Sequence, residues 1–358
     1  MSRKGNKGEW SELYVLFRLL STGIMYAADE EENIIPDVSF PVSKVLRDEG
    51  NHGVYEYTVN TENGDIIVTG RDYDREILKR DKFARAASYI YEGILNGKGR
   101  SFDIPSAENF LNNIHVFSIK ASPDKKTDIS LVLHDYYTGM DRLCGFSVKS
   151  KIGGNATLLN ASGATNFRFG IDDMSDCEMD RINAISTDKK ILSRVKAIND
   201  NGGMSFEKTA NDCFRTNLMF MDSYMEEIIA EMLMDYYSGG PKDCTELVRR
   251  LEDRNPLGYP RRGLYEYKFK QFLCSTALGM KPSKPWDGID EANGGCVIVR
   301  PGGQVIVYPL YNRNAFESYL FNNTKFDHGS SKKHGFATIF KTEDGKKHID
   351  LNLQIRFK

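Results

Sequence analysis

The sequence predicts a mixed α/β protein. Several segments repeat apolar residues at helical spacing, others alternate apolar and polar residues with a period of two, and the two kinds are interspersed along the chain. Of the 358 residues, 40% are hydrophobic and 27% are charged, which is ordinary for a globular protein. We expect a central mixed sheet flanked by helices, followed by a helical middle and a β-rich C-terminal region.

The N-terminal region begins with a predicted amphipathic helix over residues 9–21, which Gly23 ends. Strands at 54–59 and 66–69 flank Asn63-Gly64, a strong hairpin-turn signal. Further helices are predicted over residues 73–95, closed by Gly97, and over residues 106–113. Alternating patterns then predict strands over residues 115–120, 128–135, 143–150 and 164–170.

The second half of the sequence is predicted to be mostly helical before it ends in strands. Helical spacing covers residues 182–199, 218–237, 245–253 and 265–278. Strand patterns cover residues 296–300, 304–308, 337–340 and 348–357. We expect one domain over residues 1–175, with the N-terminal helix and the predicted sheet, and a second, helical and β-rich domain over residues 176–358.

The charge balance argues against a diffuse polycation. The chain has 48 Lys and Arg against 50 Asp and Glu, a net charge of −2, but residues 241–358 alone carry +7. Localised positive charge of this kind suits a site-specific nucleic-acid binder. No apolar stretch is long enough to span a membrane, so no membrane partner is expected. The six cysteines lack the spacing of a zinc site.

Residues 127–151 are predicted to form a hairpin that turns at Thr138-Gly139. A turn centred there places Asp128 opposite Lys149, on the face that Ser147 shares. A carboxylate that holds a divalent ion beside a lysine that orients water is suited to phosphodiester hydrolysis. The alternative is an exposed, salt-bridged hairpin, which the pattern alone favours.

Several motifs together resemble one nuclease family. Asp128, followed by Ser147-Val-Lys149, resembles the PD-(D/E)XK motif with serine in place of the middle acidic residue. The strings Gly145-Phe-Ser-Val-Lys-Ser-Lys-Ile-Gly-Gly, Lys7-Gly-Glu-Trp-Ser-Glu-Leu and Leu351-Asn-Leu-Gln-Ile-Arg-Phe are similar to the HpaII family of type II restriction endonucleases. The resemblance touches both ends and the centre of the chain.

The resemblance implies an enzyme that uses Mg²⁺, for which Mn²⁺ can substitute, to cut both strands of double-stranded DNA at a short palindrome. Asp128, Ser147 and Lys149 would be catalytic, with Asp128 and Glu12 as metal ligands. For Glu12, a solvated first-turn carboxylate is the equally weighted alternative. The target is CCGG if the resemblance extends to it. The family also implies a cytoplasmic bacterial protein and a separate cognate methyltransferase; a palindromic target favours a homodimer, although monomeric action stays open.

Two groups of residues are candidates for DNA contact. Amide, hydroxyl and basic side chains can hydrogen-bond base edges or phosphates, and loops often carry such readers. The candidates after the hairpin are Lys151, Asn155, Thr157, Asn160, Thr165 and Asn166. The candidates in two basic loops are Arg261, Arg262, Lys332 and Lys333. Turns that satisfy their own backbone and solvated charge runs are the alternatives.

Two other function classes are compatible with the sequence. Because Ser147 brings no charge where an acidic residue is usual, the chain could be a sequence-specific DNA-binding protein with a degenerate, inactive nuclease core. A protein-interaction module built on the helical middle would show no salt-sensitive affinity for DNA.

Overall fold

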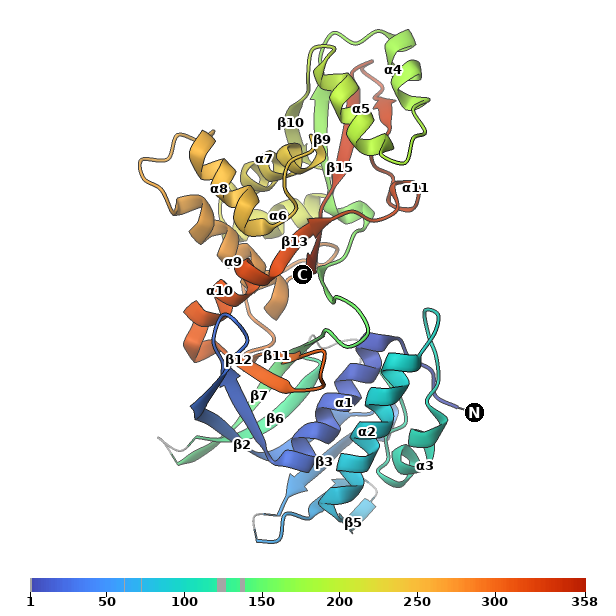
Figure 1. Ribbon diagram of the computed structural model, residues 1–358, viewed down its shortest axis with the longest axis vertical. Helices are drawn as coiled ribbons and strands as arrows, with labels where there is room; N and C mark the ends of the chain where they lie inside the picture. The colour runs from blue at the N-terminus through green and yellow to red at the C-terminus, as the bar shows by residue number, and fades with distance from the viewer. Residues whose placement is uncertain (1, 61, 72, 121–126, 136–138) are drawn as a thin grey trace. The chain divides into compact units, whose positions relative to one another are not determined.

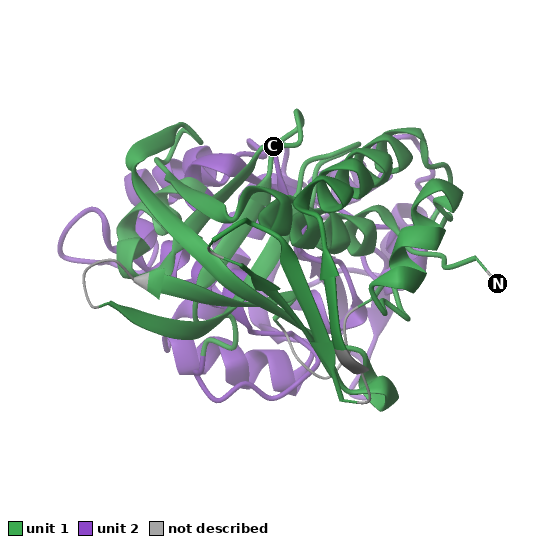
Figure 2. Ribbon diagram, turned by 90° about the horizontal axis from the view of Figure 1, so that it is seen from below, with its two compact units in different colours: residues 1–156, 290–319 green, residues 157–289, 320–358 purple. Residues whose placement is uncertain are grey.

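A computed structural model describes residues 2–60, 62–71, 73–120, 127–135 and 139–358, and it has the predicted mixture of helices and strands (Figure 1). The chain forms two compact units, coloured separately in Figure 2. Unit 1 comprises residues 1–156 and 290–319, and unit 2 comprises residues 157–289 and 320–358. The predicted division at residue 175 is therefore corrected: residues 157–171 pair with C-terminal strands of unit 2, while residues 295–309 return to the sheet of unit 1.

Unit 1 contains a nine-stranded mixed sheet in the order β1-β12-β11-β7-β6-β2-β3-β4-β5. Its strands are β1 (Ile24–Ala28), β2 (Ile34–Asp48), β3 (Val54–Val59), β4 (Ile66–Gly70), β5 (Tyr73–Leu78), β6 (Ile129–Asp135), β7 (Met140–Ser150), β11 (Gly295–Val299) and β12 (Val305–Pro309). β1 also pairs with the first half of β2, so hydrogen bonding closes a ring through β1, β12, β11, β7, β6 and β2. The mixed sheet was predicted; its closure into a ring was not.

The helices of unit 1 are α1 (Lys7–Thr22), α2 (Arg80–Asn96) and α3 (Pro105–Asn113). α1 begins at a capping box, in which the Asn6 side chain accepts from the Glu9 N–H and the Glu9 carboxylate accepts from the Asn6 N–H. It ends where Gly23 adopts φ 70°. α1 and α2 lie side by side in Figure 1, and α1 also packs on β7. The buried apolar face of α1 is part of the core of unit 1 and fixes Glu12 beside the sheet.

Unit 2 is built from two smaller sheets and a group of helices. One sheet has the order β10-β9-β15-β14 and the other β13-β16-β8. The strands are β8 (Thr157–Leu159), β9 (Asn166–Ile171), β10 (Ser205–Thr209), β13 (Thr324–Asp327), β14 (Ile339–Lys341), β15 (Lys347–Asn352) and β16 (Gln354–Phe357). The helices are α4 (Asp176–Asn183), α5 (Lys190–Asn199), α6 (Asp212–Met221), α7 (Met225–Tyr237), α8 (Cys244–Arg254), α9 (Leu264–Leu278) and α11 (Ser331–His334), and α10 (Arg313–Asn323) crosses the boundary between the units.

Several predicted elements differ from the structure. Residues 73–78 form strand β5, paired with β4, so the predicted helix begins only at Arg80. The helix predicted over residues 218–237 breaks at Asp222, whose carboxylate accepts the Tyr224 N–H at 2.9 Å. The helix predicted over residues 182–199 is likewise divided, between α4 and α5. The long strand β2 was missed because Pro36 and Pro41 interrupt its pattern.

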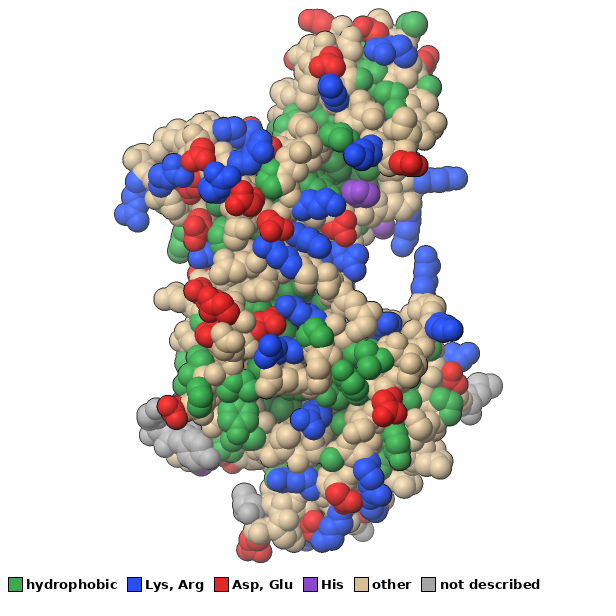
Figure 3. Space-filling view, viewed as in Figure 1, with side chains coloured by type: hydrophobic (Ala, Val, Ile, Leu, Met, Phe, Trp, Pro, Cys, Tyr) green, Lys and Arg blue, Asp and Glu red, His purple; other side chains and the backbone are tan. Residues whose placement is uncertain are grey.

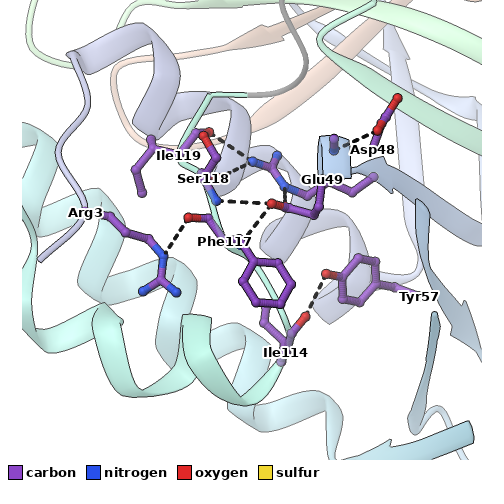
Figure 4. Close-up of polar contacts among 10 residues, drawn as sticks. Arg3, Asp48, Glu49, Tyr57, Ile114, Phe117, Ser118 and Ile119 are labelled. Atoms are coloured by element: carbon purple, nitrogen blue, oxygen red, sulfur yellow. Dashed lines mark hydrogen bonds and ion pairs between the residues drawn. The ribbon is translucent and has the colours of Figure 1, made fainter. Parts of the chain in front are cut away.

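Residues 115–120, predicted to be a strand, form none. Their backbone N–H groups point elsewhere: the Glu49 carboxylate accepts from Phe117 N–H at 2.9 Å and from Ser118 N–H at 3.1 Å (Figure 4). A side chain therefore satisfies the donors that a neighbouring strand would have used. No helix in the described part of the chain is long and apolar enough to cross a bilayer.

Candidate active site

The β6–β7 hairpin positions three of the predicted catalytic residues. Ile129 lies opposite Phe146, so Ser147, rather than Lys149, is level with Asp128. The predicted register was wrong by two residues because Asp135 pairs with Met140, which moves the turn; Thr138 lies outside the described residues. A shift of two positions leaves every side chain on its predicted face, since strand faces alternate with a period of two. Asp128, Ser147 and Lys149 therefore still share a face.

A chain of hydrogen bonds connects these three side chains. Lys149 Nζ donates to Ser147 Oγ at 2.8 Å, and Ser147 Oγ donates to Asp128 Oδ2 at 3.3 Å. The Val148 N–H donates to the same carboxylate oxygen at 2.7 Å. The predicted cross-strand contact between lysine and aspartate is thus replaced by a bridge through the serine hydroxyl. Asp128 is held by backbone and side chain together, which fixes the direction of its free oxygen.

The neighbouring strand β11 closes one side of this arrangement. It pairs with β7 in parallel, with Cys296 level with Ser147 and Ile298 level with Lys149. Both β11 residues are fully buried, and Ser147 is only 3% exposed. The serine therefore sits in a dry environment, where its hydrogen bonds to Lys149 and Asp128 are stronger than they would be in water.

Glu12 of α1 lies on the wall of the same site. Glu12 and Asp128 both line a pocket of about 140 Å³. Burial, followed by the negative charge of Asp128, raises the pKa of Glu12 to about 8, against the opposing influence of Arg47 and Lys149. Glu9, three residues earlier in α1, instead takes part in the capping box, where its carboxylate accepts from the Asn6 N–H. Two carboxylates thus approach each other with insufficient positive charge nearby.

Arg47 is a residue of this pocket that the sequence analysis missed. Its Nε atom pairs with Glu49 Oε1 at 2.5 Å, and its Nη2 atom donates to the carbonyl oxygens of Ser118 and Ile119. Arg47 and Glu49 are both buried, and the Glu49 carboxylate in turn holds the backbone of residues 117–118 (Figure 4). The guanidinium is therefore locked beside Glu12 by partners on two segments. An arginine two positions after Val45, on the buried face of a strand, was the available sequence signal.

Lys151, predicted to contact DNA, is used within unit 1. Its amine forms an ion pair with Glu32, and the side chains of both residues are 12% exposed. Tyr319 donates its hydroxyl to the same carboxylate at 2.9 Å, and Arg300 approaches it at 3.7 Å. These contacts balance the charge of Glu32 and hold Lys151 away from solvent.

The remaining candidates near residue 160 divide into exposed and buried side chains. Asn155 and Asn160 are exposed, and Thr157 is partly buried in β8. Thr165 and Asn166 are buried: the Thr165 hydroxyl donates to the Ser162 carbonyl at 3.1 Å, and Asn166 Nδ2 donates to the His334 carbonyl at 3.0 Å. The expected base contacts of Thr165 and Asn166 are therefore corrected, because their polar atoms already serve the fold of unit 2.

The two basic loops also differ from each other. Arg262 pairs with Asp253 at 2.7 Å, whereas Arg261 is exposed on the same loop. Lys332 and Lys333 are exposed on α11, which Ser330 caps. These basic residues belong to unit 2, whereas the carboxylate pocket belongs to unit 1.

The carboxylate pocket is lined by Glu12 and Asp128, two side chains of the type that Mg²⁺ prefers as ligands. Among the described residues, no cluster of three or more His, Cys, Asp and Glu side chains could hold a metal alone. Mg²⁺ is commonly bound through one or two carboxylates together with water and phosphate oxygens. Glu12 and Asp128 supply two carboxylates, and burial, followed by the negative charge of Asp128, raises the pKa of Glu12, which a bound cation would lower again. The residues therefore fit the ion.

Comparison with known proteins identifies the family. Residues 6–357 match the HpaII restriction endonuclease family. The chain is 38% identical over 357 residues to the type II restriction enzyme HpaII of Haemophilus parainfluenzae. The aligned region covers 99% of this chain and 98% of that protein. No solved structure matches the chain. The chain therefore belongs to the HpaII restriction endonuclease family.

Proposed function

We propose that the protein is a Mg²⁺-dependent type II restriction endonuclease that cuts both strands of duplex DNA at a short palindrome. The observation that carries this proposal is the hydrogen-bonded series Lys149–Ser147–Asp128 facing Glu12, in a chain of a restriction-enzyme family. The hairpin, the flanking helix and the mixed sheet support a variant PD-(D/E)XK core in which Ser147 occupies the middle acidic position.

Each side chain has a role in this proposal. Mg²⁺, or Mn²⁺ in its place, would be held by Glu12 and Asp128 and would supply electrostatic stabilisation of the scissile phosphate. Asp128 keeps one oxygen on the Val148 N–H, so the other can face the pocket. Lys149 holds a positive charge beside the position of the phosphate and orients the attacking water. Ser147 fixes the Lys149 amine at a set distance from Asp128.

We further propose CCGG as the target, as the family resemblance implies. A two-fold symmetric sequence is matched most simply by two copies of the chain, so we propose a homodimer on DNA. A separate methyltransferase of the same specificity would protect the host, and the bacterial cytoplasm is where substrate and enzyme would meet.

A plasmid digestion tests the proposal. The purified chain is incubated with a plasmid of known sequence in Mg²⁺, Mn²⁺, Ca²⁺ or EDTA, and the ends of the products are sequenced. We expect discrete fragments with ends inside CCGG in Mg²⁺ and Mn²⁺, and none in EDTA. Fragments at another palindrome would overturn the target alone, whereas intact plasmid under every condition would overturn the nuclease assignment.

A second candidate is a sequence-specific DNA-binding protein without nuclease activity. Ser147 favours it, because the site has one carboxylate fewer than the usual motif. The same digestion separates the two functions: this candidate predicts a specific footprint on duplex DNA and no strand breaks in any metal.

A further inference from the structure

Unit 2 contains a pocket of about 470 Å³, and Lys332 is the one residue of its described lining that the sequence analysis named as a candidate for DNA contact. Three segments of unit 2 meet at it: the start of α5, the end of α7 with the loop that follows, and the loop that leads into α11. Its polar lining includes Lys189, Lys190, Lys242, His328 and Lys332. We call these five residues the basic pocket.

The basic pocket carries an excess of positive charge. Asp188 is the single acidic residue in the described lining, against four lysines. Within the described part of the chain, none of the four lysines forms an ion pair within 4.0 Å. Lys189, Lys242 and Lys332 are exposed, so they can reach a ligand without breaking an existing contact. Like charges gathered around one hollow repel one another, and an anion would relieve that repulsion.

The paired basic residues of α8 provide the contrast. Arg249 pairs with Glu246 at 2.8 Å, and Arg254 lies 3.7 Å from Glu231. In Figure 3 blue side chains lie over α8 with red ones among them, and blue and purple side chains lie beside α11. Some basic residues on the surface of unit 2 are thus paired with carboxylates, whereas the lysines of the basic pocket have no carboxylate within ion-pair distance in the described part of the chain. The charge of these lysines is available to an anionic ligand.

The walls of the basic pocket suit a phosphate group rather than an apolar ligand. Gly239, Gly240 and Gly329 line it, so backbone can come close to a ligand there. Ser330 and Ser331 add hydroxyl groups, and Tyr236 and Tyr237 form part of the wall. Lysine amines, serine hydroxyls and glycine N–H groups are the donors by which proteins hold the DNA backbone.

We propose that the basic pocket binds phosphate groups of the DNA backbone and so anchors duplex DNA on unit 2. This inference rests on the proposed function, since it names a second contact with the same substrate. The pocket acts on affinity and not on sequence choice, because phosphates carry no base information. Two of its lysines, Lys242 and Lys332, belong to residues 241–358, the part of the chain with a net positive charge.

The test compares two double variants that remove equal charge. Lys189→Ala/Lys242→Ala empties two positions of the basic pocket, and Arg249→Ala/Lys346→Ala removes two exposed cations that are already paired with carboxylates. Binding of CCGG-containing and scrambled duplexes is measured in Ca²⁺ at several salt concentrations. For the pocket variant we expect roughly tenfold weaker binding of both duplexes and a salt slope smaller by about 2. The control variant should stay within about twofold of the unmodified protein.

The outcomes separate this inference from the proposed function. An unmodified protein that neither cuts nor binds DNA overturns the proposed function. An unmodified protein that cuts DNA, with both double variants binding alike, overturns the basic pocket alone. Inorganic phosphate is titrated against thermal stability as a further arm. If phosphate stabilises the unmodified protein but not the pocket variant, while DNA affinity is unchanged, the pocket takes a small anion and the DNA proposal is wrong.

Discussion

The carboxylate pocket of unit 1 and the basic pocket of unit 2 are opposites in charge. In the first, Glu12 and Asp128 approach each other, and the pKa of Glu12 rises to about 8. In the second, four lysines surround a hollow with one aspartate. Elsewhere, as at Glu32 and Lys151, opposite charges are paired. In each pocket a bound ligand of opposite charge would offset the imbalance. The ligand would be a cation in the pocket of unit 1 and a polyanion in the pocket of unit 2.

Removing the central charges of the carboxylate pocket should have the largest effect. We expect Asp128→Ala and Lys149→Ala each to lower cleavage by about 10³-fold or more, because each removes a group that faces the reacting phosphate. DNA affinity in Ca²⁺ should change by only a few fold, since the basic pocket remains. Single-turnover cleavage and filter binding measure the two quantities. Cleavage at the unmodified rate by either variant would contradict the assignment of the site.

Glu12→Gln should slow cleavage by about 10²-fold while stabilising the metal-free protein. Because the pKa of Glu12 is raised to about 8, folding takes up a proton between about pH 4.5 and 8, so stability falls as pH rises through that window. Glutamine has no charge to lose, and we expect a gain of about 4 kcal/mol at pH 8 and little at pH 4. Urea unfolding in EDTA at both pH values measures this. Equal effects at the two pH values would mean that Glu12 does not carry the charge imbalance.

Ser147→Ala should have an intermediate effect. It removes the hydroxyl that joins Lys149 to Asp128 but keeps both charges, so we expect roughly a tenfold loss of cleavage. Ser147→Thr keeps the hydroxyl and should recover most of the rate. The pH–rate profile adds a readout that packing alone would not move: it should shift for alanine and not for threonine. Identical profiles for the two variants would argue for a purely structural serine.

Lys151→Met tests the region in which Glu32 and Lys151 form an ion pair. Of these variants it should affect cleavage least. Its loss leaves Glu32 without its closest cation in a largely buried position, so we expect the protein to be destabilised by about 1–3 kcal/mol. Cleavage per folded molecule should stay within about twofold, and the salt slope of DNA binding should not change. A reduced slope would instead place Lys151 on the DNA, as the sequence first suggested.

The part of the active site that follows from periodicity could be predicted from sequence. Alternation put Asp128, Ser147 and Lys149 on one face, and this outcome survived an error of two residues in register. The error itself arose because turn geometry, which sets register, depends on backbone conformation that the residues around 138 do not specify. The bridging role of Ser147 followed from that register and so was missed.

Contacts between distant segments were beyond sequence analysis. Arg47 reaches the site from a strand whose prolines obscured its pattern, and its partners lie some seventy residues later in the chain. Thr165 and Asn166 looked like ligand-binding residues because Asn and Thr suit both tasks, and only their burial against Asn352 and His334 shows which applies. The basic pocket combines three segments, of which only the one that carries Lys332 was singled out from the sequence.

The return of residues 290–319 to unit 1 has a consequence for how the enzyme is made. β7, which carries Ser147 and Lys149, gains its partner β11 only after about 145 further residues have been synthesised, so an incomplete chain leaves this strand with an unsatisfied edge. During translation the nuclease half must therefore wait for most of unit 2 to emerge. A chain that stops before residue 295 would leave the strand that carries Ser147 and Lys149 without the partner that buries Ser147.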